Sequence, residues 1–518
     1  MAANVLSIDL GTTGVKVAVV SESGVVLAEA GEVLPLIFID GGGVEQDAHG
    51  WWSAIGRTAR QAMADSSLSP ADVMLIAVTS QYTSTVAVAA DGTPLANAIM
   101  WMDQRGRRHN PAVQALRTDG TAQRWIDIHG MAPSGNDDIG HVALFRAEMP
   151  EVYAAATAFV EPMDCIAARL TGHVTATQNT MFPMLAVDNR TWGATEYSAE
   201  LQALSGIELT KLAPLVAMGS PRGGVTAAAA GHLGVSPKAI ITDATIDSVT
   251  SAVGTGTIDS TGCGLIIGTT TVMVTHLDSK RADMAHGLTS APSPLPGQYF
   301  LVAENGIGGK ALDVFVNNIV YPDDGLGPPP PSDAYQRVLD AAGSVPIGAG
   351  GLMFLPWLVG SMAPGFQRRN RGGFVNMGIG SNRLQMARAV LEGVAMNAAW
   401  LLPHFSALAG RHYDEISLGG GGASSPLWGQ ILADCFGVRV RRLANSRTTN
   451  AHGAALLALV ENSVVQLTDV PSLLTTEQLH EPDPDAHQTY ARAVEAFIDF
   501  HDRAAPFYDA LNSPERRP

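Results

Sequence analysis

Two short segments of this sequence repeat one pattern of small residues. Both read Gly-Thr-Thr-x-Val-x-Val, the first with Gly11, Thr12 and Thr13 and the second with Gly268, Thr269 and Thr270. In each, an apolar strand runs into a tight turn and an alternating strand leaves it, which is typical of a β-hairpin. Glycine lets backbone N–H groups approach a ligand, and threonine adds hydroxyl donors. Two such hairpins facing each other could hold a phosphate chain from both sides.

Only the first hairpin carries a carboxylate beside its turn. Asp9 interrupts an otherwise apolar strand, where a buried charge is costly unless it is paired or binds a metal. It could bind Mg²⁺ beside the phosphates, or it could cap the turn. The second Gly-Thr-Thr copy favours the phosphate role, and Lys16 then joins the nucleotide-binding candidates. The second copy has Ile266 in place of the aspartate, so we expect the metal at the first hairpin.

A second carboxylate could do acid–base chemistry. Asp247 begins a predicted helix of small residues over 247–253, where it could accept a proton from a substrate hydroxyl. Capping of that helix is the alternative, and spacing alone favours it. Asp243 competes for the role of base.

Two polar or glycine-rich segments could complete a site. Gln81, Tyr82, Thr83 and Ser84 separate two apolar strands, and Trp101, Asp103 and Arg105 follow. Such a break at the carboxyl end of a buried strand is a place for substrate contacts, or it is an ordinary loop with a charge pair. Residues 419–422 are four glycines between a strand and a helix, which favours an adenosine site but also suits a flexible loop. No P-loop occurs, although Gly308, Gly309 and Lys310 resemble the end of one.

Composition agrees with a soluble enzyme of two domains. The chain has 518 residues, 46% of them hydrophobic, and a net charge of −17, which disfavours nucleic-acid binding. Its three cysteines are widely spaced, which fits neither a zinc site nor a disulfide framework and suits the reducing cytoplasm. We expect no signal peptide and no membrane-spanning segment.

The elements that must position these residues alternate between strands and helices. A three-stranded meander is predicted within residues 5–40, then a helix capped by Asp47, a buried strand over 73–79 and mainly helices from about 110 to 235. A strand over 240–242 precedes the helix of Asp247. After the second hairpin, strands are predicted over 352–355 and 416–418, with a long helix over 384–402. The repeat, at a spacing near half the chain, predicts two related halves.

Taken together, these residues resemble the FGGY family of carbohydrate kinases, and within it the xylulokinase-like branch. The resemblance runs in order along nearly the whole chain. It includes the two hairpins, Trp51-Trp52, the Gln81 segment, Trp101 to Arg105, Asp247 to Gly254, Phe354 to Trp357, Arg388 to Val394 and Gly419 to Ala423. Any one of these motifs is weak, whereas eight in the right order are specific.

The resemblance implies a fold and a set of roles. The fold would be α/β, with two actin-like (ribonuclease H-like) ATPase domains around a central cleft, residues 1–254 for the sugar and 255–518 for the nucleotide. Asp247 falls on the catalytic base and Asp9 on the residue associated with Mg²⁺. Substrate-binding residues would be Gln81, Tyr82, Thr83, Asp103, Asp247 and Ser248. Residues for ATP would be Gly11, Thr12, Thr13, Lys16, Gly268, Thr269, Thr270, Gly309, Gly420, Gly421, Gly422, Ala423 and Ser424.

Departures from the family pattern cluster on the sugar side. Tyr82-Thr83 replaces the Met-His pair of bacterial xylulokinases, Ser361 to Pro364 replaces Glu-Arg-Thr-Pro, and His141 stands near the place of a family lysine. We therefore expect an ATP- and Mg²⁺-dependent kinase for a ketopentose such as D-xylulose, with glycerol, a tetritol or ribulose as alternatives. Two rival classes are an actin-like ATPase without a sugar acceptor and an inactive sugar-binding protein. A homodimer is left open.

Overall fold

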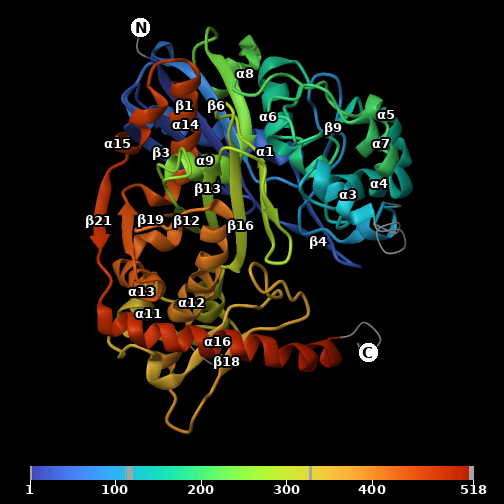
Figure 1. Ribbon diagram of the computed structural model, residues 1–518. Coiled ribbons are helices and arrows are strands. Elements are labelled where there is room, and N and C mark those ends of the chain that lie inside the picture. The colour runs from blue at the N-terminus through green and yellow to red at the C-terminus, as the bar shows by residue number, and fades with distance from the viewer. Residues whose placement is uncertain (1–2, 111, 114–120, 326–328, 513–518) are drawn as a thin grey trace.

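The computed structural model describes residues 3–110, 112–113, 121–325 and 329–512 and contains two large sheets, one above the other (Figure 1). The first sheet has six strands in the order β10-β11-β6-β1-β2-β3. Its strands are β1 (Asn4–Gly11), β2 (Gly14–Val20), β3 (Val26–Val33), β6 (Val73–Ser80), β10 (Gly223–Gly224) and β11 (Ile240–Ile246).

The second sheet has eight strands in the order β14-β15-β16-β13-β12-β19-β20-β21. Its strands are β12 (Gly264–Ile267), β13 (Thr270–Leu277), β14 (Ala282–Asp283), β15 (Leu288–Pro292), β16 (Tyr299–Ile307), β19 (Glu415–Gly419), β20 (Arg439–Leu443) and β21 (Thr476–His480). Shorter strands outside the two sheets are β4 (Ile37–Ile39), β5 (Gly43–Gln46), β7 (Val86–Val88), β8 (Ala98–Ile99), β9 (Ala158–Val160), β17 (Met353–Leu355) and β18 (Gly373–Val375).

The two sheets share a topology, which confirms the prediction of related halves. β1 is antiparallel to β2 and parallel to β6, and β11 continues the parallel part of the first sheet. In the second sheet β12 is antiparallel to β13 and parallel to β19, and β20 continues the parallel part. Each predicted Gly-Thr-Thr segment is the turn of the first hairpin of its sheet.

Strand β1 divides its side chains between two faces of the first sheet, as the two-residue period requires. Leu6, Ile8 and Leu10 pack in the core on the side of helix α1 (Ala48–Ser66). Val5 packs on the other side, against helix α14 (Thr449–Glu461). Asp9, an even number of residues from Val5, therefore lies on the side of α14.

Helices cover both sheets. The predicted helix capped by Asp47 is α1 (Ala48–Ser66), in which the Asp47 side chain accepts the backbone N–H of His49 at 3.0 Å. The helices between β6 and β11 form a lobe beside the first sheet (Figure 1): α3 (Thr121–Ile128), α4 (Asp138–Glu148), α5 (Pro150–Ala155), α6 (Pro162–Thr171), α7 (Ala199–Ser205) and α8 (Ala227–Leu233). The second half contributes α10 (Gly309–Phe315), α11 (Ala334–Gly343), α12 (Arg383–Ala409), α13 (Pro426–Phe436), α14 (Thr449–Glu461), α15 (Val470–Leu473) and α16 (Pro484–Leu511).

Strand β11 is longer than predicted. The sequence predicts a strand over 240–242, but the strand continues to Ile246. The buried Asp243 carboxylate is paired with the Arg222 guanidinium at 2.9 Å, which offsets the cost of burying its charge. The strand therefore delivers Asp247 directly to the start of helix α9 (Asp247–Gly254).

Helices α9 and α14 join the two halves by close backbone contact. A Cβ atom on Gly453 of α14 would lie 1.9 Å from the carbonyl oxygen of Thr250 in α9, and one on Gly254 would lie 2.2 Å from the carbonyl oxygen of Thr449. The Ser251 hydroxyl also donates to Asn450 Oδ1 at 2.7 Å. Only glycine permits this approach, because any side chain would meet backbone atoms that cannot rotate away. In the described part of the chain, no helix is both long and apolar enough to cross a bilayer.

We predict that Gly453→Ala separates these helices and lowers the free energy of unfolding by about 1–3 kcal/mol, the usual cost of overpacking. Gly231→Ala is the matched control, because Gly231 lies in α8 and a Cβ there would meet nothing within 4 Å. That change should leave stability the same or raise it slightly. Thermal or denaturant unfolding of both variants checks the prediction, and equal stability of the two would contradict it.

Candidate active site

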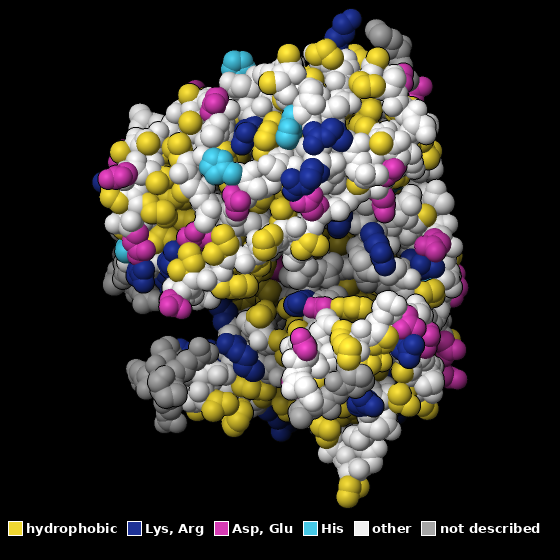
Figure 2. All heavy atoms as spheres, turned by 180° about the vertical axis from the view of Figure 1, so that it is seen from behind, with side chains coloured by type: hydrophobic (Ala, Val, Ile, Leu, Met, Phe, Trp, Pro, Cys, Tyr) yellow, Lys and Arg dark blue, Asp and Glu magenta, His cyan; other side chains and the backbone are white. Residues whose placement is uncertain are grey.

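A cavity of about 350 Å³ lies between the two halves. From the first half it is lined by residues that include Thr12, Gln81, Tyr82, Thr83, Trp101, Asp247 and Ser248. From the second half it is lined by residues that include Thr270, Val272, Val302, Glu304, Met362, Phe366 and Arg368. Figure 2 shows the molecule notched between its upper and lower parts. The structure thus brings both hairpin turns and most of the predicted substrate-binding residues to one cavity.

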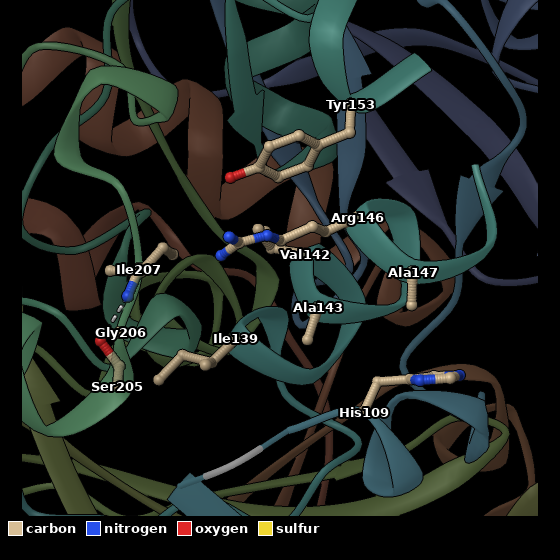
Figure 3. A pocket seen from close by; sticks show the side chains of 10 residues that line it. All are labelled: His109, Ile139, Val142, Ala143, Arg146, Ala147, Tyr153, Ser205, Gly206 and Ile207. Atoms are coloured by element: carbon tan, nitrogen blue, oxygen red, sulfur yellow. Dashed lines mark hydrogen bonds between the residues drawn. The ribbon is translucent and has the colours of Figure 1, made fainter. Parts of the chain in front are cut away.

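A second pocket, of about 450 Å³, has a different character (Figure 3). All its lining residues lie between His109 and Ile207, so they come from the helical lobe alone. Its walls are mainly the aliphatic side chains of α4, with Arg146 and Tyr153 above them. Because it holds neither a buried carboxylate nor a Gly-Thr-Thr turn, we assign the chemistry to the cavity between the halves.

The first hairpin holds the loop of Gln81 by hydrogen bonds. The Thr12 hydroxyl donates to Gln81 Oε1 at 2.7 Å and accepts from Trp101 Nε1 at 3.1 Å. Gln81 Nε2 is buried and has no hydrogen-bond partner among the described residues. A buried amide without an acceptor is costly, so this group is available to a ligand hydroxyl in the cavity.

The loop around Thr83 is fixed from beneath by a buried glutamate. Glu161 accepts the backbone N–H groups of Thr83 at 2.9 Å and Ser84 at 3.2 Å. Thr83 has a φ of 60°, which a non-glycine residue adopts only when its surroundings hold it there. Burial, together with the neighbouring Asp138, raises the pKa of Glu161 well above its usual range. This support keeps Tyr82 and Thr83 directed at the cavity.

Asp247 is a half-buried carboxylate in the cavity, at the N-terminus of α9. Burial, and then the charge of Asp9, raises the pKa of Asp247 to about 8, although hydrogen bonds from Ser248 oppose the shift. No cation pairs with it among the described residues. A carboxylate with these properties can accept a proton from a ligand hydroxyl. Asp243, the competing candidate, lies outside the cavity and is paired with Arg222.

Asp9 lies in the middle of β1, opposite Lys16 of β2. Burial raises the pKa of Asp9 to about 6, although the charge of Lys16 lowers it. The Lys16 ammonium donates to the backbone carbonyl of Arg447 at 3.0 Å instead of pairing with Asp9. Asp9 Oδ1 is buried and has no hydrogen-bond partner in the part of the chain that the structure describes. An orphaned carboxylate oxygen beside a phosphate-type turn fits a divalent cation.

The second hairpin turn is tied to the start of α10. The N–H of Gly309 donates to the carbonyl of Gly268 at 2.8 Å, and the N–H of Gly308 donates to that of Thr269 at 2.9 Å. Gly309 therefore supports the turn, and its N–H is already hydrogen-bonded within the protein, to Gly268. Thr270 lines the cavity, so this turn faces the first one.

The glycine-rich loop ends beside the same turn. A Cβ on Gly420, which has a φ of 83°, would lie 2.6 Å from the carbonyl oxygen of Ile267. A Cβ on Gly422 would lie 2.5 Å from the Ile267 side chain, whereas one on Gly421 would meet nothing within 4 Å. The loop thus packs tightly on the end of β12 and leaves an open face at Gly421. Ser424 is exposed on the same turn.

One predicted contact needs correction. Asp103 was expected to contact the substrate, but it is wholly buried, does not line the cavity and accepts hydrogen bonds from Val44 N and Arg105. Its charge holds the segment that carries Trp101. Ala423 lies in the glycine-rich turn, with its side chain buried in the second core.

Most of the cavity wall that the second half supplies was not predicted from the sequence. Glu304 of β16, Phe366 and Arg368 line the cavity without having been predicted, whereas Met362 belongs to the segment Ser361 to Pro364 that was placed on the sugar side. The sequence did contain a signal for Glu304, because it is the one charged residue in the mainly apolar strand Tyr299–Ile307. The loop residues carry no local pattern that distinguishes them from other surface residues.

The pKa of Asp247 gives a prediction about stability. Since the pKa is raised on folding, the native state binds more protons than the unfolded state between about pH 4 and pH 8, and stability falls as pH rises through that range. Asp247→Asn removes this loss. We expect the melting temperature of the variant minus that of the unsubstituted protein to become larger as the pH rises from 5 to 8. Both proteins are measured without nucleotide or metal. Asp40→Asn, at an exposed position, is the control; identical pH profiles for Asp247→Asn and the unsubstituted protein would refute the prediction.

Comparison with known proteins agrees with this geometry. Residues 4–254 match the N-terminal domain of the FGGY family of carbohydrate kinases, and residues 263–461 match its C-terminal domain. The chain is 26% identical over 457 residues to the xylulose kinase of Bacillus subtilis, covering 88% of this chain and 87% of that protein. It is 29% identical over 471 residues to the glycerol kinase of Methylibium petroleiphilum, covering 88% and 89%.

Solved structures show the same fold. The gluconate kinase of Lactobacillus acidophilus has a TM-score of 0.83 to this structure at 22% identity, covering 99% of this chain and all of that one. This likeness confirms the predicted α/β fold of two domains. The domain matches extend over most of the sequence and include both hairpins, Asp247 and the glycine-rich loop. The chain therefore belongs to the FGGY family of carbohydrate kinases, which transfer a phosphoryl group from ATP to a sugar with the help of Mg²⁺.

Proposed function

We propose that this kinase phosphorylates a hydroxyl of a small ketose, with D-xylulose as the first candidate. Glycerol, a tetritol and ribulose are the alternatives, since the relatives include both xylulose and glycerol kinases. In the proposed division of labour, residues 1–254 bind the sugar and supply the base, and residues 255–518 bind the nucleotide.

The observation that carries this proposal is the placement of Asp247. It is a carboxylate of raised pKa, without a paired cation, in the cavity that both Gly-Thr-Thr turns approach through Thr12 and Thr270. In the proposed reaction its carboxylate accepts the proton of the sugar hydroxyl while the hydroxyl oxygen attacks the γ-phosphorus and ADP leaves. The two turns would hold the phosphates in line with the acceptor.

Asp9 is the proposed ligand for Mg²⁺, directly or through water. The ion would neutralise charge on the β- and γ-phosphates when bound. The turn residues Gly11, Thr12, Thr13, Gly268 and Thr269 would offer backbone and hydroxyl donors to the phosphates. Gly420 to Gly422 and Ser424 would lie against the adenosine. Lys16, bonded to a carbonyl of the second half, would act by holding the halves together.

On the sugar side, Gln81 would donate its unpartnered amide to a sugar hydroxyl, and Tyr82, Thr83 and Ser248 would complete that wall. The three cysteines are buried and unpaired, which suits the cytoplasm, where we propose that the enzyme acts. A homodimer stays a prediction, which a measurement of the mass of the protein in solution would test.

An actin-like ATPase is the contrasting class. It would share the hairpins but would need neither an acceptor cavity nor a base within it. Appreciable ATP hydrolysis that no sugar stimulates would favour this class, whereas sugar-dependent ADP release favours the kinase.

We predict that Asp247→Asn lowers kcat for the best sugar by about 10²–10⁴-fold, the usual contribution of a general base. Nucleotide affinity should change little, because Asp247 lies on the acceptor side. An ADP-release assay over ketoses, aldoses and polyols of three to seven carbons, combined with calorimetric titration of ADP, checks both statements. Turnover of the variant close to that of the unsubstituted enzyme would refute the role of Asp247.

We predict that Asp9→Asn raises the Mg²⁺ concentration needed for half-maximal activity, because the orphaned carboxylate charge is lost. The measurement is initial rate against Mg²⁺ at fixed sugar and ATP. Asp40→Asn serves as the control for removal of an acidic charge elsewhere. An unchanged Mg²⁺ dependence in Asp9→Asn would show that the ion is held by other groups.

A further inference from the structure

Glu304 is a charged residue inside a core strand. Strand β16 has nine residues, and Glu304 is the one that is not buried. Its neighbours in the strand pack in the second core or against the first one. Its side chain instead lines the cavity that holds Asp247 and Tyr82.

The backbone at Glu304 is fixed on both sides. The residue pairs with Val272 of β13, and its carbonyl accepts the N–H of Ala363 at 3.1 Å. The next residue, Asn305, donates from its side chain to the carbonyls of Ala363 at 2.8 Å and Asn397 at 3.0 Å. The carboxylate therefore extends into the cavity from a rigid support.

The Glu304 carboxylate has no partner of its own. No described residue donates a hydrogen bond to it or forms an ion pair with it, and burial raises the pKa of Glu304 to about 7. Its charge also raises the pKa values of Asp247 and Tyr82, which places it close to both. A second carboxylate near Asp247 opposes folding, so the fold itself does not explain it. A ligand with hydroxyl donors would satisfy it.

We propose that Glu304 is a sugar-binding residue that accepts hydrogen bonds from hydroxyl groups of the substrate other than the one phosphorylated. This inference rests on the proposed kinase function and narrows its substrate class. The ligand is a polyol or ketose with a free hydroxyl, or a vicinal pair, on the side that faces the second half. A carboxylate with two oxygens can accept from two such hydroxyls at once.

This assignment gives the sugar a contact from each half. Gln81 contacts it from the first half and Glu304 from the second. Five residues after Glu304, at the start of α10, the N–H of Gly309 holds the second Gly-Thr-Thr turn. One continuous segment thus links the proposed sugar contact to the phosphate turn.

The test uses the full-length enzyme with Glu304→Gln and Glu304→Ala. We expect the KM for the best sugar to rise by about 10- to 100-fold in Glu304→Ala, the range for loss of charged hydrogen bonds, and by less in Glu304→Gln. The KM for ATP should change less than threefold. Analogues of the sugar that each lack one hydroxyl group locate the contact. The analogue that lacks the hydroxyl bound by Glu304 should be a poor substrate for the unsubstituted enzyme, and Glu304→Ala should lower its turnover little further.

Glu495→Gln, an exposed change of the same kind on α16, is the control, and melting temperatures establish that the variants fold. A sugar KM in Glu304→Ala within twofold of the unsubstituted value would overturn the inference, as would equal losses for every deoxy analogue. Stabilisation of the protein by sugars, measured as a shift in melting temperature, does not depend on turnover. If a sugar stabilises the unsubstituted protein without being phosphorylated, the kinase proposal fails, yet loss of that shift in Glu304→Ala still supports the contact. If no sugar stabilises it, both fail.

Discussion

The close crossing of α9 and α14 is the contact on which the arrangement of the site depends. At Gly254 and Gly453 the two helices meet backbone to backbone, with no room for a Cβ atom. Helix α9 begins with Asp247, and α14 (Thr449–Glu461) begins beside the glycine-rich loop of the second half, where the N–H of Gly420 donates to the carbonyl of Ser446 at 2.9 Å. The crossing therefore sets the distance between the acceptor side and the nucleotide side. The crossing also lies on the side of β1 that carries Asp9. The carboxylates of Asp9 and Asp247 are therefore both positioned by the same rigid contact between α9 and α14.

Three carboxylates near this junction have no cation as a partner among the described residues. Asp9, Asp247 and Glu304 each have a pKa raised chiefly by burial. Two acids outside the cavity differ from them, because Asp243 is paired with Arg222 and Asp103 is paired with Arg105. These two paired acids shape a strand and a loop, whereas the three unpaired ones cost stability that ligands, namely a cation and hydroxyl groups, are suited to restore.

Sequence reasoning reached those features that local patterns encode. Both hairpins, the helix that starts at Asp247 and the glycine-rich turn were predicted, because alternation, small residues and capping act within a few positions. Prediction failed at positions whose structure is determined by a residue far away in the sequence. Asp103 looked like a substrate ligand until the structure placed Arg105 and Val44 N against it, and β11 looked short because Arg222, 21 residues before Asp243, was not seen as its partner. Glu304 stands out as the one charged residue of β16, but nothing near it in the chain indicates which cavity the strand faces.

The two hairpins have the same topology but different proposed roles. The sheets share a topology, yet the position two residues before the turn is Asp9 in one half and Ile266 in the other. Two carboxylates across a phosphate chain would repel it, so in the proposed site a single acid beside one turn leaves the other turn to bind phosphate through neutral donors. The second half places its acid further along, at Glu304 in the cavity, where we propose that it meets the sugar. In the proposed site, Asp9, Asp247 and Glu304 thus lie where a cation, a proton and sugar hydroxyls, respectively, would meet their charge.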